Sequence, residues 1–274
     1  MDLTQQNYHS LAANREYMSN SQWSSWLECA AATKAEQDGK YVKEQTPAMF
    51  ISSYYDRALT APHEFETYCA VHRDKIFKEV GKKGEKTWEK RADFATADAV
   101  IAIIKQDPAY QQLVANCKMQ EILTGEIGGV KFRYMADFTM HGQRAAVLDL
   151  KCMANMDPVY VESVRRRIEW YDAWGYLRQL SIGRHLYQQN YEATPTLGIL
   201  AVTKEEIPLK RTYVFEDEDR INGEIQHIIE MLPTVMAWKS GEIEPPACGT
   251  CSYCRSQSSF VVERLAVSAR PFTE

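Results

Sequence analysis

The clearest alternation of apolar and polar residues lies between Gly129 and Lys151. From Val130 to Thr139, apolar side chains occupy every second position, and this period of two predicts a strand with one apolar face. A second alternation begins at Ala146, and the residues between the two runs include a glycine typical of a turn. The pattern therefore predicts a β-hairpin.

Two acids take facing positions on this hairpin. In the register in which paired residue numbers sum to 286, Asp137 lies opposite Asp149 on one face, which requires a loop of odd length or a bulge. Carboxylates at cross-strand distance repel unless a cation lies between them, and hard oxygen ligands suit Mg²⁺ or Mn²⁺. Lys151 projects beside Asp149, where its ammonium group can orient or activate a water and balance the charge of a phosphate. The hairpin thus predicts a metal site, and a surface hairpin with solvated charges is the alternative.

The other periodicities predict an α/β fold, with helices flanking a mixed central β-sheet, as a single domain over residues 1–274. A capping box at 19–22 opens a helix with Trp23 and Trp26 on one face. Further predicted helices cover 48–59, 97–105, a stretch opening at 107–108, 157–190 and 217–238, and predicted strands cover 118–126, 196–203 and 209–215.

Composition adds limits to this fold. Apolar residues make up 45% and charged residues 25% of the 274 residues, and no run approaches the roughly 18–20 apolar residues of a membrane span. The N-terminus lacks the basic and apolar segments of a signal peptide, so we expect a cytoplasmic protein in which the seven cysteines are thiols or metal ligands. A net charge of −5 argues against an indiscriminate nucleic-acid binder but is compatible with a nuclease.

Lysine is concentrated between residues 73 and 91, which predicts a mobile basic loop. The basic residues are Lys75, Lys78, Lys82, Lys83, Lys86, Lys90 and Arg91. Solvated surface is the ordinary interpretation, and contact with a DNA phosphate backbone is the functional one.

The spacing of Asp137 to Asp149-Leu150-Lys151 resembles the core motif of PD-(D/E)xK nucleases. With Gly129 and the basic residues that follow it, the wider context resembles phage and prophage exonucleases of the RecE type. The chain departs from that pattern at Cys152, where the family usually has threonine. The resemblance implies Asp137 and Asp149 as metal ligands and Lys151 as the catalytic lysine.

The same resemblance extends the predicted site. It implies metal-site roles for Asp56, at the end of Ser52–Asp56, and for Leu150, and it places a Tyr-x-x-Gln pair, Tyr176 and Gln179, opposite the scissile phosphate. From the strand at 118–126, Gln120, Glu121 and Glu126 compete for a place in the site; Glu121 ranks first by family likeness, although strand parity groups Gln120 with Glu126. Candidate phosphate contacts are Arg165, Arg166, Arg167, Arg178 and Arg184.

A cysteine motif at 248–254 forms a second candidate metal site. Cys248, Cys251 and Cys254 are too close in sequence for unstrained disulfides, and a tetrahedral zinc or a cubane cluster needs a fourth ligand, for which Cys29 is the natural candidate. The layout resembles AddB and the CRISPR-adaptation exonucleases, in which such cysteines hold a [4Fe-4S] cluster, but their C-terminal spacing is longer. Zinc, or no metal, therefore stays open.

The RecE-type resemblance implies a Mg²⁺-dependent 5′→3′ exonuclease on the ends of linear double-stranded DNA. It implies a homo-oligomeric ring and a single-strand annealing protein as partner in phage-type recombination, located in the host cytoplasm if phage-encoded. Two alternatives are an iron–sulfur nuclease of repair or CRISPR adaptation, which needs a helicase or integrase partner, and a non-catalytic DNA-binding scaffold.

Overall fold

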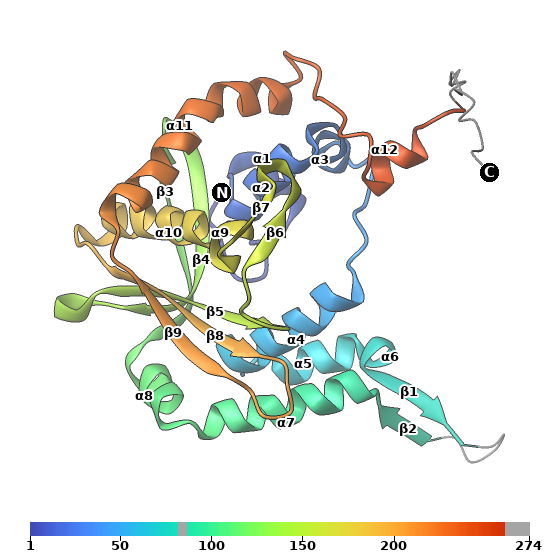
Figure 1. Ribbon diagram of the computed structural model, residues 1–274, viewed down its shortest axis with the longest axis vertical. Coiled ribbons are helices and arrows are strands. Elements are labelled where there is room, and N and C mark those ends of the chain that lie inside the picture. The colour runs from blue at the N-terminus through green and yellow to red at the C-terminus, as the bar shows by residue number, and fades with distance from the viewer. Residues whose placement is uncertain (82–86, 261–274) are drawn as a thin grey trace, which may run out of the picture.

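A five-stranded mixed sheet forms the centre of the protein in the computed structural model, which describes residues 1–81 and 87–260 (Figure 1). Its strand order is β3-β4-β5-β8-β9. The strands are β3 Lys118–Ile127, β4 Val130–Met140, β5 Ala146–Met153, β8 Thr196–Thr203 and β9 Lys210–Phe215. The β5–β8 pair is parallel and the other neighbours are antiparallel, so the predicted mixed sheet is confirmed.

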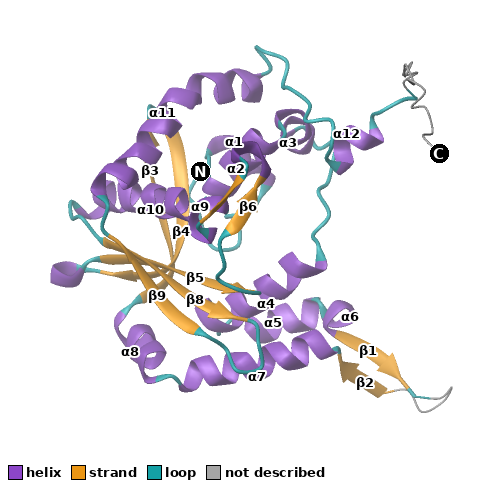
Figure 2. Cartoon of the chain, viewed as in Figure 1, coloured by secondary structure: helices purple, strands orange, loops and turns teal. Residues whose placement is uncertain are grey.

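Helices cover both faces of this sheet (Figure 2). Within the described residues they are α1 Leu11–Glu16, α2 Asn20–Glu28, α3 Ala30–Gln37, α4 Pro47–Thr60, α5 Phe65–Val71, α6 Arg73–Ile76, α7 Ala92–Gln106, α8 Pro108–Asn116, α9 Trp170–Ala173, α10 Tyr176–Tyr191, α11 Glu218–Ser240 and α12 Ser252–Ser256. None of them is long and apolar enough to cross a membrane.

Two apolar cores result from the alternation along the central strands. Trp23 of α2 and Phe132 of β4 belong to the core that includes α10 and α11. Phe138 and Leu150 project into the core formed with α4 and α7. Because both faces of the sheet are covered, the central strand β8 is apolar along most of its length, as predicted.

The elements at the N-terminus and along the sheet follow the predictions closely. The side chain of Ser19 accepts a hydrogen bond from Gln22 N, and the Gln22 side chain accepts one from Ser19 N, so the predicted capping box opens α2. Thr46 caps α4, and Asp107 caps α8 with proline in its first turn.

The predicted continuous helix over 157–190 is wrong in its first half. Residues 159–168 form a hairpin of β6 Val159–Val161 and β7 Arg166–Ile168 around a short 3-10 turn. The β-branched residues of β6 favour a strand. Gly175, at φ +66°, then separates α9 from α10, because a left-handed residue interrupts the helical hydrogen-bond pattern. Tyr176 therefore begins a helix instead of lying in the middle of one.

The basic stretch 73–91 also differs from the predicted loop. It contains α6 and an antiparallel hairpin of β1 Phe77–Val80 and β2 Thr87–Lys90, which projects from the body in Figure 1. Lys78 pairs with Glu89, and the Arg73 guanidinium lies over the Trp88 ring. The predicted contacts at Lys82, Lys83 and Lys86 lie outside the described residues.

Candidate active site and thiol cluster

The β4–β5 hairpin adopts the predicted register. Phe138 pairs with Leu148 and Met140 with Ala146, so paired residue numbers sum to 286, across an odd-length loop at 141–145. Beyond Phe138 the ladder stops, and the amide of Leu150 donates a 2.7 Å hydrogen bond to Asp137 Oδ2. The carboxylate thus takes a main-chain donor of the neighbouring strand, which ties Asp137 to the strand that carries Asp149.

A third carboxylate joins this pair from α4. Asp56 lines one cavity of about 350 Å³ with Asp137 and Asp149, referred to below as the acidic cavity. Asp56 Oδ1 accepts a hydrogen bond from the Thr60 hydroxyl. Burial raises the pKa of Asp137 well above its usual range, and the charges of Asp149 and Asp56 add to this effect. Burial also raises the pKa of Asp56. The three acids therefore form an electrostatically unfavourable cluster in the absence of a cation.

Lys151 supplies the ammonium group in this cavity. Its Nζ lies 2.5 Å from Asp149 Oδ2 and 4.6 Å from the centre of the Tyr176 ring. Burial favours the neutral amine, but the charges of Asp149 and Asp137 outweigh it and raise the pKa of Lys151. One ammonium group balances only one of the three carboxylates.

Tyr176 and Gln179 reach the cavity from the first turn of α10. The Gln179 amide donates a 2.6 Å hydrogen bond to Asp149 Oδ1. The close packing of α10 on β4 depends on Gly183, because a Cβ there would lie 2.7 Å from the Tyr134 ring. Gln179 thus contacts a predicted metal ligand directly, a role that the resemblance did not imply.

The residues fit a divalent cation. Asp149 is 2% exposed, and its carboxylate contacts the Gln179 amide through Oδ1 and the Lys151 ammonium group through Oδ2. Three carboxylates that share one cavity with a single ammonium group are typical of a site for a hard cation. Asp56, Asp137 and Asp149 would hold such a cation. Leu150 lines the same cavity and could contribute only its main-chain carbonyl.

The backbone conformation of β3 determines which of Gln120, Glu121 and Glu126 reaches the aspartates of the acidic cavity. Gln120 has a φ of +51°, interrupts the β3–β4 pairing between Met119 and Glu121, and donates hydrogen bonds to Asp137 Oδ1 (3.1 Å) and to the Thr60 hydroxyl (2.7 Å). Glu126 is exposed. The structure therefore places Gln120 beside the acids, and not Glu121, which ranked first by family likeness. Strand parity grouped Gln120 with the exposed Glu126, so the sequence pattern did not single Gln120 out.

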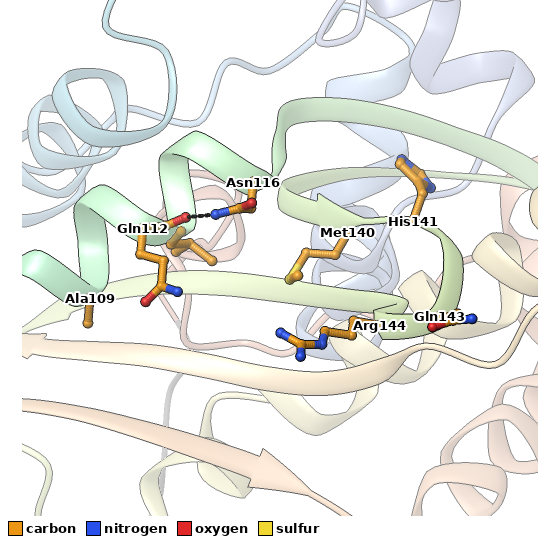
Figure 3. Close-up of a pocket in the computed structure, with 8 residues that line it drawn as sticks. Ala109, Gln112, Asn116, Met140, His141, Gln143 and Arg144 are labelled. Atoms are coloured by element: carbon orange, nitrogen blue, oxygen red, sulfur yellow. Dashed lines mark hydrogen bonds between the residues drawn. The ribbon is translucent and has the colours of Figure 1, made fainter.

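Glu121 belongs to a different cluster. Its carboxylate accepts hydrogen bonds from the Thr139 hydroxyl and, at 2.5 Å, from the Tyr191 hydroxyl, and it lies 3.0 Å from His141 Nε2. His141 also lines a cavity of about 680 Å³ between α8 and the loop after β4 (Figure 3). That cavity contains no carboxylate among the residues that line it, so it lacks the chemistry of the acidic cavity.

The five candidate arginines separate into two groups. Arg184 forms a two-pronged ion pair with Glu218, and Arg178 donates to Asn20 and Ser24 of α2. These two guanidinium groups hold the fold together. Arg165, Arg166 and Arg167 are exposed on the β6–β7 hairpin, where Arg167 donates a hydrogen bond to Pro158 O, and their contact with phosphate stays a prediction.

The four predicted cysteines come from opposite ends of the chain and lie together in the fold. Cys29 lies at the junction of α2 and α3, and the C-terminal three lie at α12 and the turn before it. Their Sγ atoms all lie within 4.8 Å of one another, and none of the four forms a disulfide. These four cysteines are called the thiol cluster below. Backbone hydrogen bonds from Thr250 and Cys251 lower the pKa of the Cys248 thiol to about 6.

A mixed sheet that places two aspartates and an Asp-x-Lys lysine at one cavity defines the PD-(D/E)xK nuclease class. The chain belongs to the family described as "PDDEXK-like domain of unknown function (DUF3799)", whose family model matches residues 19–257. The predicted PD-(D/E)xK superfamily is thereby confirmed.

Solved structures agree with this assignment. A crystal structure from Eubacterium rectale that carries the name "Putative exonuclease" superposes with a TM-score of 0.84 at 25% identity, covering 97% of each chain. The crystal structure of SSO0001 matches with a TM-score of 0.29 at 12% identity, over 82% of this chain and 90% of that one, a likeness too weak to carry an argument. No curated protein matches the chain.

Proposed function

We propose that this protein is a metal-dependent DNA exonuclease that hydrolyses phosphodiester bonds in the acidic cavity. The observation that carries the proposal is the meeting of Asp56, Asp137 and Asp149 with Lys151 in one cavity. Three carboxylates and one ammonium group leave an excess of buried negative charge, which a divalent cation would neutralise. Mg²⁺ and Mn²⁺ are the cations of choice for an all-oxygen ligand set.

Each side chain has a distinct role in this proposal. When bound, the cation would lower the pKa of a water molecule and stabilise the charge that develops on the phosphate. Lys151, held between Asp149 and the Tyr176 ring, presents an ammonium group to a phosphate oxygen or an attacking water. Gln179 fixes the orientation of Asp149, and Gln120 fixes that of Asp137.

The finer parts of the proposal concern substrate and partners. The name of the E. rectale structure supports exonuclease activity, and the resemblance to RecE-type enzymes supports 5′→3′ digestion of linear duplex ends. That resemblance also supports a ring-shaped homo-oligomer that supplies single-stranded tails to an annealing protein during recombination. The exposed arginines of the β6–β7 hairpin offer contacts to the DNA backbone.

Digestion of duplex DNA in Mg²⁺ or in EDTA tests the activity. Linear duplexes labelled at either the 5′ or the 3′ end, with a covalently closed circle as control, separate exonuclease from endonuclease action and give the polarity. We expect Mg²⁺-dependent loss of the 5′ label as mononucleotide and an intact circle. DNA binding that is independent of metal, with no cleavage of any substrate, would instead indicate a scaffold. Light scattering of the purified protein tests the ring.

A further inference from the structure

The thiol cluster lies outside the acidic cavity and shares no residue with it. In Figure 1, α12 lies beside α3 and is connected to the rest of the fold by an extended segment. We propose that these cysteines bind a single zinc ion in a tetrahedral structural site, and not an iron–sulfur cube. This inference is independent of the proposed nuclease activity.

The spacing of the sulfur atoms carries the choice of metal centre. Cys29 Sγ lies 3.6 Å from Cys254 Sγ and 3.8 Å from Cys251 Sγ, and Cys248 Sγ lies 3.9 Å from Cys254 Sγ. Four thiolates at the zinc–sulfur distance of about 2.3 Å around one ion form a tetrahedron whose edges are about 3.8 Å. These three distances match those edges, and the remaining sulfur pairs lie within 4.8 Å.

An iron–sulfur cube requires a wider arrangement. Each cysteine sulfur of a [4Fe-4S] cluster binds a different iron at the corners of a cube, which places the sulfur atoms roughly 6 Å apart. Here all four Sγ atoms lie within 4.8 Å of one another. Sulfur atoms at these separations can surround one ion, and a cube would force the cysteines outward.

Main-chain amides around the cluster favour thiolate ligands. The amide of Cys251 donates to Cys248 Sγ at 3.3 Å, and the amide of Cys254 donates to Cys251 Sγ at 3.5 Å. Hydrogen bonds of this kind offset part of the negative charge that four thiolates carry around a divalent ion. A tetrahedral site with four protein ligands has no open position for substrate, so it is structural.

The site would fasten the C-terminal segment to the N-terminal helices. Residues 241–250 are almost entirely exposed, so little apolar burial holds them. Contacts to the N-terminal part of the fold include a hydrogen bond from Ala31 N to Pro246 O (3.1 Å) and, from α12, an edge-on pair of the Tyr41 and Tyr253 rings. Because the ligands come from both ends of the chain, zinc binding would contribute directly to folding free energy.

Metal analysis of the full-length protein, expressed with both iron and zinc supplied and purified without oxygen, tests the proposal. We expect one zinc per chain after dialysis, no acid-labile sulfide and no brown colour. Exchange with Co²⁺ should give the intense visible absorption of tetrahedral cobalt thiolate. Iron and sulfide in equal amounts, or a protein without bound metal, would overturn the proposal.

Single substitutions assign the metal to these residues. Cys251→Ser should abolish stoichiometric zinc and lower the melting temperature, whereas Cys117→Ser, at a free cysteine outside the cluster, should retain one zinc per chain. If Cys251→Ser does not fold, the metal content and the cobalt spectrum of the wild type still decide the question. Full zinc occupancy and an unchanged melting temperature in Cys251→Ser would place the metal elsewhere.

Discussion

The acidic cavity and the thiol cluster are both groups of metal-ligating side chains, but they are assembled in different ways. The cavity combines Asp137 and Asp149 from adjacent strands with Asp56 from α4, so its ligands lie on packed elements of the core. The thiol cluster joins Cys29 to three cysteines more than two hundred positions away, in the short helix α12 and the turn before it. The first is held by the sheet, whereas the second, with zinc bound as proposed, would help to hold the chain together.

The chemistry of the ligands follows this difference. The acidic cavity contains hard oxygen donors and carries excess negative charge. Its volume of about 350 Å³ suits a cation that must also contact a substrate. The cluster offers four soft sulfur donors with no open position. A substitution in the first should therefore impair cleavage, and one in the second should impair folding.

The largest expected effect is the loss of cleavage in Asp149→Ala. Removal of a ligand and of the partner of Lys151 should lower the initial rate on end-labelled linear duplex by ~10³-fold or more, because transition-state stabilisation by the cation is lost. Zinc content should stay at one per chain and DNA binding should survive. Asp157→Ala, at an exposed aspartate, is the matched control and should cleave normally. Wild-type rates in Asp149→Ala would remove the cavity from catalysis.

A smaller loss is expected in Gln179→Ala. The missing hydrogen bond to Asp149 should slow cleavage by about 10–100-fold, the usual effect of losing a residue that orients a metal ligand. Calorimetry with Mn²⁺ distinguishes two routes: weakened Mn²⁺ affinity indicates action through Asp149, and unchanged affinity indicates contact with the substrate alone. Gln188, which also lies on α10, provides the control: Gln188→Ala removes only a hydrogen bond to Thr194, beyond the end of the helix. Unaltered cleavage in Gln179→Ala would contradict both routes.

Stability should change in opposite directions at the two sites. In buffer without added divalent metal, Asp56→Asn should raise the free energy of unfolding by about 0.5–2 kcal/mol, because it removes one of three mutually repelling carboxylates while an amide oxygen can still accept from Thr60. Thermal unfolding would measure this, alongside the destabilised Cys251→Ser. Destabilisation by Asp56→Asn would show that repulsion among the acids is not the dominant force there.

The smallest effect concerns the exposed arginines. Arg166→Ala should weaken DNA binding only a few-fold and reduce the slope of log affinity against log salt by about 1, as expected for one lost phosphate contact. Arg184→Ala should leave the salt slope unchanged but lower the melting temperature, since Arg184 is paired with Glu218. Equal salt slopes for Arg166→Ala and wild type would exclude the β6–β7 hairpin from the DNA interface.

Local patterns in the sequence predict much of the active site. The period of two between Val130 and Thr139, with the turn after it, was sufficient for the register that brings Asp137 toward Asp149. The capping box at Ser19 likewise placed the start of α2. These features depend on neighbours in the sequence or across one hairpin, where side-chain periodicity and turn geometry decide the outcome.

Other features were decided only by the tertiary structure. The left-handed conformation of Gln120 directs its side chain to Asp137, and Gly175 starts α10 where the sequence pattern predicted an uninterrupted helix. Helical spacing cannot reveal that Arg178 and Arg184 are already paired, because their partners come from α2 and from the first turn of α11.

The thiol cluster depends on both levels. The sequence determined which residues take part, since the C-x-x-C-x-x-C spacing lacks one ligand and Cys29 was the candidate to supply it. It could not determine how far apart the sulfur atoms lie, because that separation depends on how the α2–α3 junction packs against α12. Only the folded chain places the four Sγ atoms within 4.8 Å of one another, and the proposal of a single zinc ion in place of a cube rests on this distance.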